Sequence, residues 1–364
     1  MDRKRVLIIN CCFTSNFGDQ AIGVTVEKLF KENNCDVDLY DIIRVDNKIR
    51  STLYRSKSAL STARGDKSKR GVLRSLIVHF KKSLAATRWK SKNRKMIESI
   101  ARNKYDIVII GGGELIQSNR IFSVAIYAWI SAVKRFNSNI KIVFFGVGVT
   151  DTYTRRDKAL FRSSFKHADA FYLRDVNSIN NLKSIFGFSS KLIPDVVFGG
   201  YDKVYNSSCV SSTVLYGITS FDRIKRYRYK NLTDRKDYYE HVYRELLDIG
   251  LSNSALDVKL MYSDIHDFKE CHAFSSYIFD VYRMKIEICS YETLLGFEKE
   301  VSECKALISP RMHACIFGLI YGKDVRIIDI SKKTNAFHKE YLSANVDFVN
   351  MRKALMLAIN EVLI

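Results

Sequence analysis

The chain has 364 residues, of which 47% are apolar, and it carries a formal net charge of +20. This length and hydrophobicity suffice for two domains with buried cores, which excludes a disordered chain. Residues 46–104 hold 18 lysines and arginines against three acidic residues. Such concentrated charge predicts an anionic partner for this stretch and says nothing about the fold.

No apolar run is long enough to span a bilayer, and the apolar stretch at residues 6–9 is too short for a signal peptide. We therefore expect a cytoplasmic protein. The eight cysteines lack Cys-x-x-Cys spacing, and most fall within apolar patterns. They are expected to be small core residues, without a zinc site or a disulfide framework.

Short apolar segments alternate with amphipathic segments through the first 200 residues. Strands are expected at residues 6–10, 37–43, 106–110, 140–145 and 170–173 and near 191. Helices are expected between them at residues 19–32, from 72 onward, and at 121–135, 155–166 and 178–185. Six strands that alternate with helices predict a doubly wound, mostly parallel sheet.

The same alternation returns after a predicted linker at residues 199–211. Strands are expected at residues 213–218, 257–261, 285–289, 306–308 and 325–330. Helices are expected at residues 237–247, 268–279, 291–304, 311–321 and 350–363. The fold class is therefore α/β, with two Rossmann-like domains (1–200 and 211–345) that face a cleft. The final segment, 346–364, is expected to be a helix that packs back across the domains.

The basic stretch, at about residues 47–100, is an insertion in the first domain. Its first part, 47–70, is polar and is predicted to be a mobile loop, and a long amphipathic helix begins at Val72. The predicted apolar face comprises Leu73, Leu76, Ile77, Phe80 and Leu84, with Trp89 beyond it. The predicted basic face comprises Arg74, Lys81, Lys82, Arg88, Lys90 and Lys92. Residues 72–95 fit an anionic membrane surface as well as they fit a domain helix with a solvated basic face. No nucleic-acid-binding module accompanies the charge.

One segment places an arginine and a histidine directly after a predicted strand. Ser309 and Pro310 form a turn after residues 306–308, and Arg311 and His313 lie in the first turn of the next helix. Open α/β sheets bind ligands at this edge, where a helix N-terminus also favours an anion. Arg311 can hold a phosphate or carboxylate, and His313 can transfer a proton near neutral pH. The alternatives are that Arg311 pairs with a structural carboxylate and that His313 caps the helix.

Two further loops have the composition of ligand-binding loops. Asn16, Gly18 and Asp19 lie between the first strand and its helix, where phosphate-bearing ligands are often held. Three glycines at 111–113 end a buried strand and would let a ligand approach the backbone. Neither loop has the dinucleotide-binding or P-loop spacing. For the first loop, the alternative is a helix cap made by Asp19.

Taken together, these motifs resemble those of the polysaccharide pyruvyl transferase family. The resemblance covers roughly residues 5–340 and rests on the order of its pieces. They are Asn16-Phe-Gly-Asp19, Asp106-Ile-Val-Ile-Ile-Gly-Gly-Gly113, Gly146-Val-Gly148, Leu173-Arg-Asp175 with Ser178, Pro194-Asp-Val-Val-Phe198, Ser309-Pro-Arg-Met-His313, and Lys332-Lys333 through Phe337. Two features depart from the family pattern: Lys323-Asp324 stands after Gly322 where a proline is usual, and the basic insertion is long.

The resemblance implies a GT-B-like fold and the transfer of a pyruvyl group from phosphoenolpyruvate to a sugar, which gives a cyclic ketal. The acceptor would belong to a cell-surface polysaccharide, such as a capsule or exopolysaccharide, or to its lipid-linked precursor. The enzyme would then work in the cytoplasm or at the inner face of the cell membrane. It implies no metal and no cofactor besides phosphoenolpyruvate as donor substrate.

The predicted catalytic residues are His313, Arg311 and Asp19. His313 is the candidate for proton transfer, and Asp19 is a weaker candidate for orienting or deprotonating the hydroxyl. Arg311 and Arg174 would clamp the donor from the two domains. The full predicted donor-binding set is Arg174, Arg311, Asn16, Gly18, Gly111, Gly112, Gly113, Ser309 and Lys332.

Two other functions remain open at this point. One is a GT-B-type glycosyltransferase that uses a nucleotide-sugar donor. The other is a non-catalytic scaffold of a glycan-assembly complex, in which the basic helix would make the essential contact. Fold alone does not separate these from the transferase.

Overall fold

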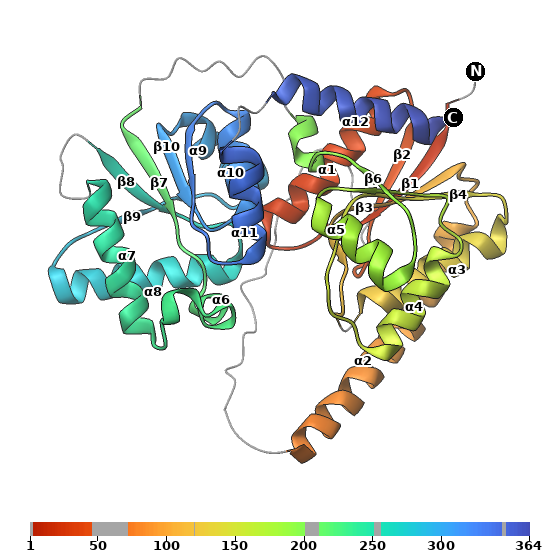
Figure 1. Cartoon of the computed structure of the whole chain (residues 1–364), viewed down its shortest axis with the longest axis horizontal. Coiled ribbons are helices and arrows are strands. Elements are labelled where there is room, and N and C mark those ends of the chain that lie inside the picture. Colours follow the sequence, from red (N-terminus) through yellow and green to blue (C-terminus); the bar gives the residue numbers. More distant parts are fainter. Residues whose placement is uncertain (1–2, 46–71, 120, 201–210, 251–255, 344–346) are drawn as a thin grey trace.

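A computed structural model describes residues 3–45, 72–119, 121–200, 211–250, 256–343 and 347–364, and for 72–84 the backbone only. Three predicted features therefore lie outside the described residues and side chains: the loop at 47–70, most of the linker at 199–211 and the apolar face at Leu73–Leu84. The described part forms two α/β domains beside each other (Figure 1).

The N-terminal domain is built on six parallel strands in the order β2-β1-β3-β4-β5-β6. They are β1 (Arg5–Asn10), β2 (Asp36–Asp41), β3 (Ile107–Ile116), β4 (Lys141–Val149), β5 (Ala170–Leu173) and β6 (Lys191–Leu192). The helices are α1 (Phe17–Glu32), α2 (Val72–Ala101), α3 (Phe122–Phe136), α4 (Arg155–Phe165) and α5 (Val176–Asn181). The central strands are apolar on both faces because helices cover the sheet on both sides.

The C-terminal domain has five parallel strands in the order β11-β10-β7-β8-β9. They are β7 (Thr213–Gly217), β8 (Asp257–Met261), β9 (Glu287–Ile288), β10 (Ala306–Ser309) and β11 (Asp324–Ile327). Its helices are α6 (Phe221–Tyr227), α7 (Arg235–Ile249), α8 (Ile265–Tyr282), α9 (Leu294–Glu303), α10 (Met312–Ile320) and α11 (Lys332–Phe337). The predicted pair of parallel-sheet domains is confirmed. Helices α6 and α11 were not predicted from the sequence.

Each sheet reverses its strand order at one position, and the two positions face the same cleft. In the first sheet the reversal lies between β1 and β3, and in the second it lies between β7 and β10. A parallel sheet leaves a crevice at the carboxyl ends of the strands on either side of such a reversal. The residues that follow these four strands are therefore the ones that topology places at a ligand.

The two domains are joined by a packed seam. Phe17, at the start of α1, is buried among aromatic rings of the C-terminal domain, with ring centroids 5.6 Å from Tyr291 and 5.3 Å from Phe297. Its backbone N–H donates to the Ser263 carbonyl at 2.9 Å. Helix α12 (Phe348–Leu363) returns to the N-terminal domain, where Arg352 bonds the Gly199 carbonyl and pairs with Glu32 at 2.7 Å (Figure 1).

The basic helix corresponds to α2, but its tryptophan does not face outward. Trp89 is 9% exposed and its Nε1–H donates to the Ile43 carbonyl at 2.8 Å. Ala86, Ile97 and Ile100 are buried on the same side, and α2 packs against α3. This half of α2 is therefore a domain helix, which was one of the two alternatives for residues 72–95, and membrane binding by this stretch stays a prediction. Only the first turns of α2 project past the domain in Figure 1.

Two other observations bear on the predicted classes. Among the described residues, no helix has both the length and the hydropathy needed to cross a membrane. Seven cysteines are described; all are free thiols, and all except Cys11 are buried.

Candidate active site

A cavity of about 340 Å³ opens between the domains at the two strand-order reversals. Its N-terminal wall includes Asn10 after β1 and Gly112 in β3, and its C-terminal wall includes Thr219 after β7 and Arg311 after β10. Five cations line it (Arg174, Arg223, Arg226, Arg311 and Lys333) against two carboxylates, Asp19 and Glu114. The lining therefore favours an anionic ligand.

His313 lies where the two domains meet. It is the second residue of α10, and its ring packs directly on Gly18 of α1. A Cβ atom at position 18 would lie 2.2 Å from His313 Nδ1, so this approach requires glycine. Gly18 thus serves the site through the space it leaves for the histidine.

The other ring nitrogen of His313 faces a buried carboxylate of the N-terminal domain. His313 Nε2 lies 3.6 Å from Asp195 Oδ2, and it is buried without a hydrogen-bond partner among the described residues. Asp195 Oδ2 also accepts from Arg174 Nη1 at 3.2 Å, and its Oδ1 accepts from the Val197 N–H at 3.1 Å. Burial alone would raise the pKa of Asp195, but His313 and Arg174 hold it below its ordinary value. A carboxylate that stays ionised can fix the orientation and tautomer of a histidine ring.

Asp19 and Lys333 face each other across the same cavity. Burial raises the pKa of the Asp19 carboxyl, and the charges of His313, Lys333 and Arg174 oppose that rise. Asn16 caps α1 and also donates from Nδ2 to Asp19 Oδ2 at 3.0 Å. The helix cap is therefore Asn16, and the alternative of a cap made by Asp19 is wrong. Lys333 has solvent access, yet the surrounding protein and the Arg174 guanidinium lower its pKa.

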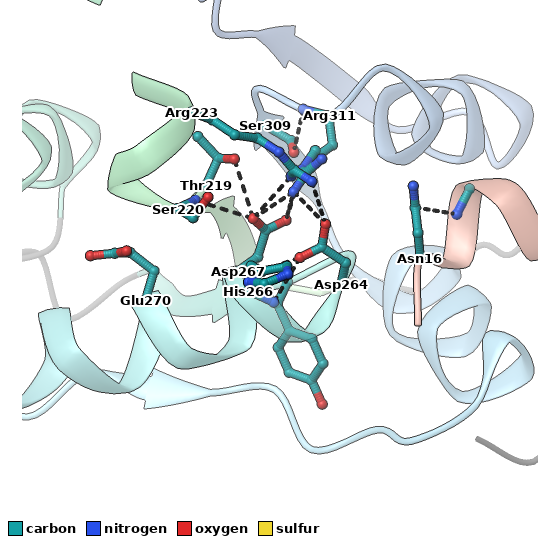
Figure 2. Close-up of polar contacts among 12 residues, drawn as sticks. Asn16, Thr219, Ser220, Arg223, Asp264, His266, Asp267, Glu270, Ser309 and Arg311 are labelled. Atoms are coloured by element: carbon teal, nitrogen blue, oxygen red, sulfur yellow. Dashed lines mark hydrogen bonds and ion pairs between the residues drawn. The ribbon is translucent and has the colours of Figure 1, made fainter. Parts of the chain in front are cut away.

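Arg311 lines the cavity, but its guanidinium is already bound by two carboxylates. Its Nε donates to Asp267 Oδ2 at 2.7 Å, and its Nη2 donates to Asp264 Oδ2 at 2.8 Å and to Asp267 Oδ1 at 2.6 Å. Arg223 pairs with the same two aspartates, as Figure 2 shows. The alternative in which Arg311 pairs with structural carboxylates therefore describes its position. Arg311 and Arg174 both line the cavity, and the two-arginine clamp of the donor stays a prediction.

The remaining predicted site residues divide into two groups. Asn16, Gly18, Gly112 and Gly113 line the cavity, and Gly112 and Gly113 have positive φ angles of 62° and 72°. Gly111 and Ser309 do not line it: Gly111 packs against Ile109, Val26 and Ile8, and the fully buried Ser309 hydroxyl accepts from the Arg311 N–H. The prediction that Gly111 and Ser309 contact the donor directly is therefore corrected, because neither residue lines the cavity.

The lysine that reaches the cavity is Lys333. Lys332, the predicted one, lines two neighbouring hollows and not this cavity, whereas Lys333, the next residue of the short helix α11, lines this cavity and one of those hollows. Prediction also missed Asp195 and Arg223 as site residues. Asp195 could have been predicted as a site residue, because Pro194-Asp195 follows a strand at the same edge of the sheet. Among the described residues, no three His, Cys, Asp or Glu side chains are grouped as metal ligands.

The fold resembles that of several solved sugar-nucleotide epimerases at low sequence identity. UDP-GlcNAc 2-epimerase from Methanocaldococcus jannaschii matches with a TM-score of 0.51 and 11% identity over 97% of this chain and 92% of that one. UDP-N-acetylglucosamine 2-epimerase from Rickettsia bellii gives 0.51 and 9% over 100% and 96%. The UDP-GlcNAc 2-epimerase from Neisseria meningitidis gives 0.50 and 12% over 99% of both chains. At these identities the likeness concerns the fold, which is GT-B-like.

No curated protein matches this sequence. The family model for polysaccharide pyruvyl transferase, however, matches residues 16–332, a span from the Asn16 cap to the start of α11 that holds nearly all of the cavity lining. The chain therefore belongs to the polysaccharide pyruvyl transferase family and is a transferase.

Proposed function

We propose that this enzyme transfers the pyruvyl group of phosphoenolpyruvate to two hydroxyls of a sugar in a cell-surface polysaccharide or its lipid-linked precursor. The observation that carries the proposal is the pairing of His313 with Asp195 across the two domains, inside a cavity with more cations than carboxylates. A proton donor beside an anion site is what phosphoenolpyruvate chemistry requires.

The donor carries a phosphate and a carboxylate, and three groups are placed to receive them. Lys333 faces the cavity with a lowered pKa, and Arg174 keeps donors beyond the one that Asp195 accepts. At the opposite wall, Arg223 pairs with Asp264 and Asp267, but its buried Nη1, 3.5 Å from Asp267 Oδ1, makes no hydrogen bond in the described chain. An anion that met these donors would be held from both domains.

In the proposed reaction, His313 gives a proton to the methylene carbon of the donor, which becomes a methyl group. Asp195 orients the imidazole through Nε2, so Nδ1 beside Gly18 is the nitrogen that acts. A sugar hydroxyl attacks the neighbouring carbon and gives up its proton by way of Asp19, and this proton then restores the one that His313 gave. A second hydroxyl then displaces phosphate, and its proton leaves with the phosphate.

Asp19 is the residue proposed to accept or orient the hydroxyl proton. Its carboxylate faces His313 and Lys333, and a carboxyl with a raised pKa is a better base near neutral pH than an ordinary one. Asn16 fixes its rotamer through the bond at 3.0 Å. Arg311 has a supporting role here: with Asp264 and Asp267 it holds the turn that carries His313.

The test is phosphate release from phosphoenolpyruvate with a panel of simple and lipid-linked galactosides, glucosides and amino sugars, with product masses read in parallel. Phosphate release together with the mass of a pyruvate ketal is the expected result. If every acceptor is silent, calorimetric titration of phosphoenolpyruvate decides: binding supports the donor assignment. No binding of phosphoenolpyruvate but binding of a nucleotide sugar would overturn the proposal in favour of a glycosyltransferase.

A further inference from the structure

A second cavity of about 320 Å³ adjoins the first, and the two share one wall. Four residues belong to both linings: Glu114, Arg174, Met312 and Lys333. The pair described above spans this wall, because His313 lines the first cavity and Asp195 lines the second. A group held in the first cavity is therefore next to anything held in the second.

The two cavities differ in charge. The second is lined by five carboxylates (Glu114, Asp151, Asp175, Asp195 and Glu340) against three cations, Arg174, Lys332 and Lys333. The first has the opposite balance, five cations against two carboxylates. An anion such as phosphoenolpyruvate is therefore favoured in the first cavity and disfavoured in the second. The second suits a neutral molecule with many hydroxyl groups, which carboxylate oxygens accept from.

The floor of the second cavity is aromatic. Phe337 and Tyr341 line it, with ring centroids 5.0 Å apart, and Tyr341 rests on Phe198 at 5.1 Å. Both rings are fixed, since Phe337 is 3% exposed and Tyr341 is 7% exposed. A sugar ring offers an apolar C–H face as well as hydroxyls, so rigid aromatic rings below polar walls fit its two-sided chemistry.

Three polar side chains of this cavity reach solvent and can bind a ligand, although Asp151 accepts a hydrogen bond from the Thr152 hydroxyl at 3.0 Å and Glu340 is hydrogen-bonded to Tyr341. Asp151 follows β4, Asn177 lies in α5, and Glu340 follows α11, so three separate segments converge on the cavity. All three side chains are exposed. Asp175 and Asn181 are less free, since Asp175 caps α5 and Asn181 donates to the Val149 carbonyl at 2.9 Å.

We propose that this second cavity is the acceptor subsite and holds a neutral sugar ring on Phe337 and Tyr341, with its reacting hydroxyls at the wall of Arg174 and Lys333. Asp151, Asn177 and Glu340 bind its other hydroxyls and so contribute to the choice of sugar. The assignment rests on the proposed transfer from phosphoenolpyruvate in the first cavity.

Ligand-observed saturation-transfer NMR with methyl β-galactoside, methyl β-glucoside and methyl N-acetyl-β-glucosaminide tests the subsite without the natural acceptor. At least one glycoside should receive saturation from the wild-type enzyme. Ala336→Trp, which fills the cavity from α11, should reduce that signal at least fivefold. The milder variants Asp151→Asn and Glu340→Gln should weaken it, while Asp280→Asn and Glu303→Gln, on exposed helix surface, should leave it unchanged.

Phosphoenolpyruvate titration of the same variants separates this inference from the proposed function. The donor should bind Asp151→Asn, Glu340→Gln and Ala336→Trp with the wild-type dissociation constant. No glycoside signal, or a signal that survives all three substitutions, overturns the subsite. A wild-type enzyme that binds a glycoside there but no phosphoenolpyruvate overturns the donor assignment and leaves the sugar subsite standing.

Discussion

Two clusters of charged side chains flank the cleft, and they are organised differently. In the seam cluster, Arg174, Asp195, His313 and Lys333 come from both domains, and His313 Nε2 lies 3.6 Å from its carboxylate without a hydrogen bond. In the paired cluster, Arg223, Asp264, Asp267 and Arg311 all belong to the C-terminal domain, with contacts of 2.5–2.8 Å at Arg311.

This difference indicates that the paired cluster stabilises the fold and that the seam cluster takes part in the reaction. Two arginines matched by two carboxylates at short distance balance one another's charge, so the paired cluster holds β10, α8 and α6 together, although Arg223 Nη1 makes no hydrogen bond in the described chain. The seam cluster keeps an unsatisfied histidine nitrogen and a lysine with a lowered pKa at a cavity. Strongly perturbed groups in a cleft are the usual mark of a reacting centre.

The largest effect is expected from breaking the seam cluster. His313→Ala should lower turnover by about 10²–10⁴-fold, the usual contribution of a general acid or base. The dissociation constant of phosphoenolpyruvate should stay nearly unchanged, because His313 is not among the proposed anion contacts. Steady-state kinetics and calorimetry measure the two quantities. His272→Ala, an exposed histidine of α8, is the matched control. Full activity in His313→Ala would remove the histidine from the mechanism.

Breaking the paired cluster should act on stability. Arg311→Ala leaves Asp264 and Asp267, both nearly fully buried, without their main counter-charge, which costs about 3–5 kcal/mol of unfolding free energy. Urea denaturation measures the loss, and Arg244→Ala on the exposed face of α7 should change it by less than about 0.5 kcal/mol. A stable Arg311→Ala enzyme that specifically loses donor affinity would return Arg311 to the anion site.

The Gly18→Ala variant tests whether the position of the His313 ring at the domain interface matters for turnover. An alanine Cβ there would lie 2.2 Å from His313 Nδ1 and would displace the ring from its position beside Asp195. A displacement of about 1 Å in a catalytic group costs about 10²-fold in rate. Turnover in Gly18→Ala should fall by that order, with donor affinity retained. Gly187→Ala has open space for the new atom but a φ of 82°, so it controls for glycine replacement with backbone strain and no contact.

The smallest effect concerns a buried carboxylate that belongs to neither cluster. Burial raises the pKa of Glu298 on α9 to about 7, opposed by Lys28. A raised carboxyl pKa costs stability once the group ionises: the cost is absent below about pH 4, grows from there, and is full above pH 7. Glu298→Gln should therefore raise the melting temperature at pH 8 and not at pH 4. An equal gain at both pH values would contradict this cause.

Much of the fold could be predicted because both sheets are parallel and covered on both faces. Such strands are short apolar runs that periodicity detects, and β1 and β10 lie within a residue of their predicted bounds. Helices α6 and α11 were missed because one or two turns carry too little periodicity. The direction of Trp89 was also beyond reach, because an apolar helix face looks the same whether it packs on a domain or on lipid.

The site could be predicted only in part. A sequence pattern places residues at the edge of a sheet, but it does not show which side chains they contact. Arg311 and His313 were both found after β10, yet Arg311 meets carboxylates 44 and 47 positions away. Asp195 and His313 meet only because the domains pack through Phe17. Neither meeting has a signal in a single sequence, which is why the two arginines looked equivalent before the fold was known.

The most direct test of the seam cluster uses two adjacent lysines. Phosphoenolpyruvate is titrated calorimetrically into the wild-type enzyme, Lys333→Met and Lys332→Met. Lys333 lines the cationic cavity as well as the neighbouring one, whereas Lys332 lines the neighbouring one and not the cationic cavity, so Lys333→Met should lose donor binding and Lys332→Met should retain it. Equal affinity in both variants, or loss in Lys332→Met alone, would contradict the placement of the donor.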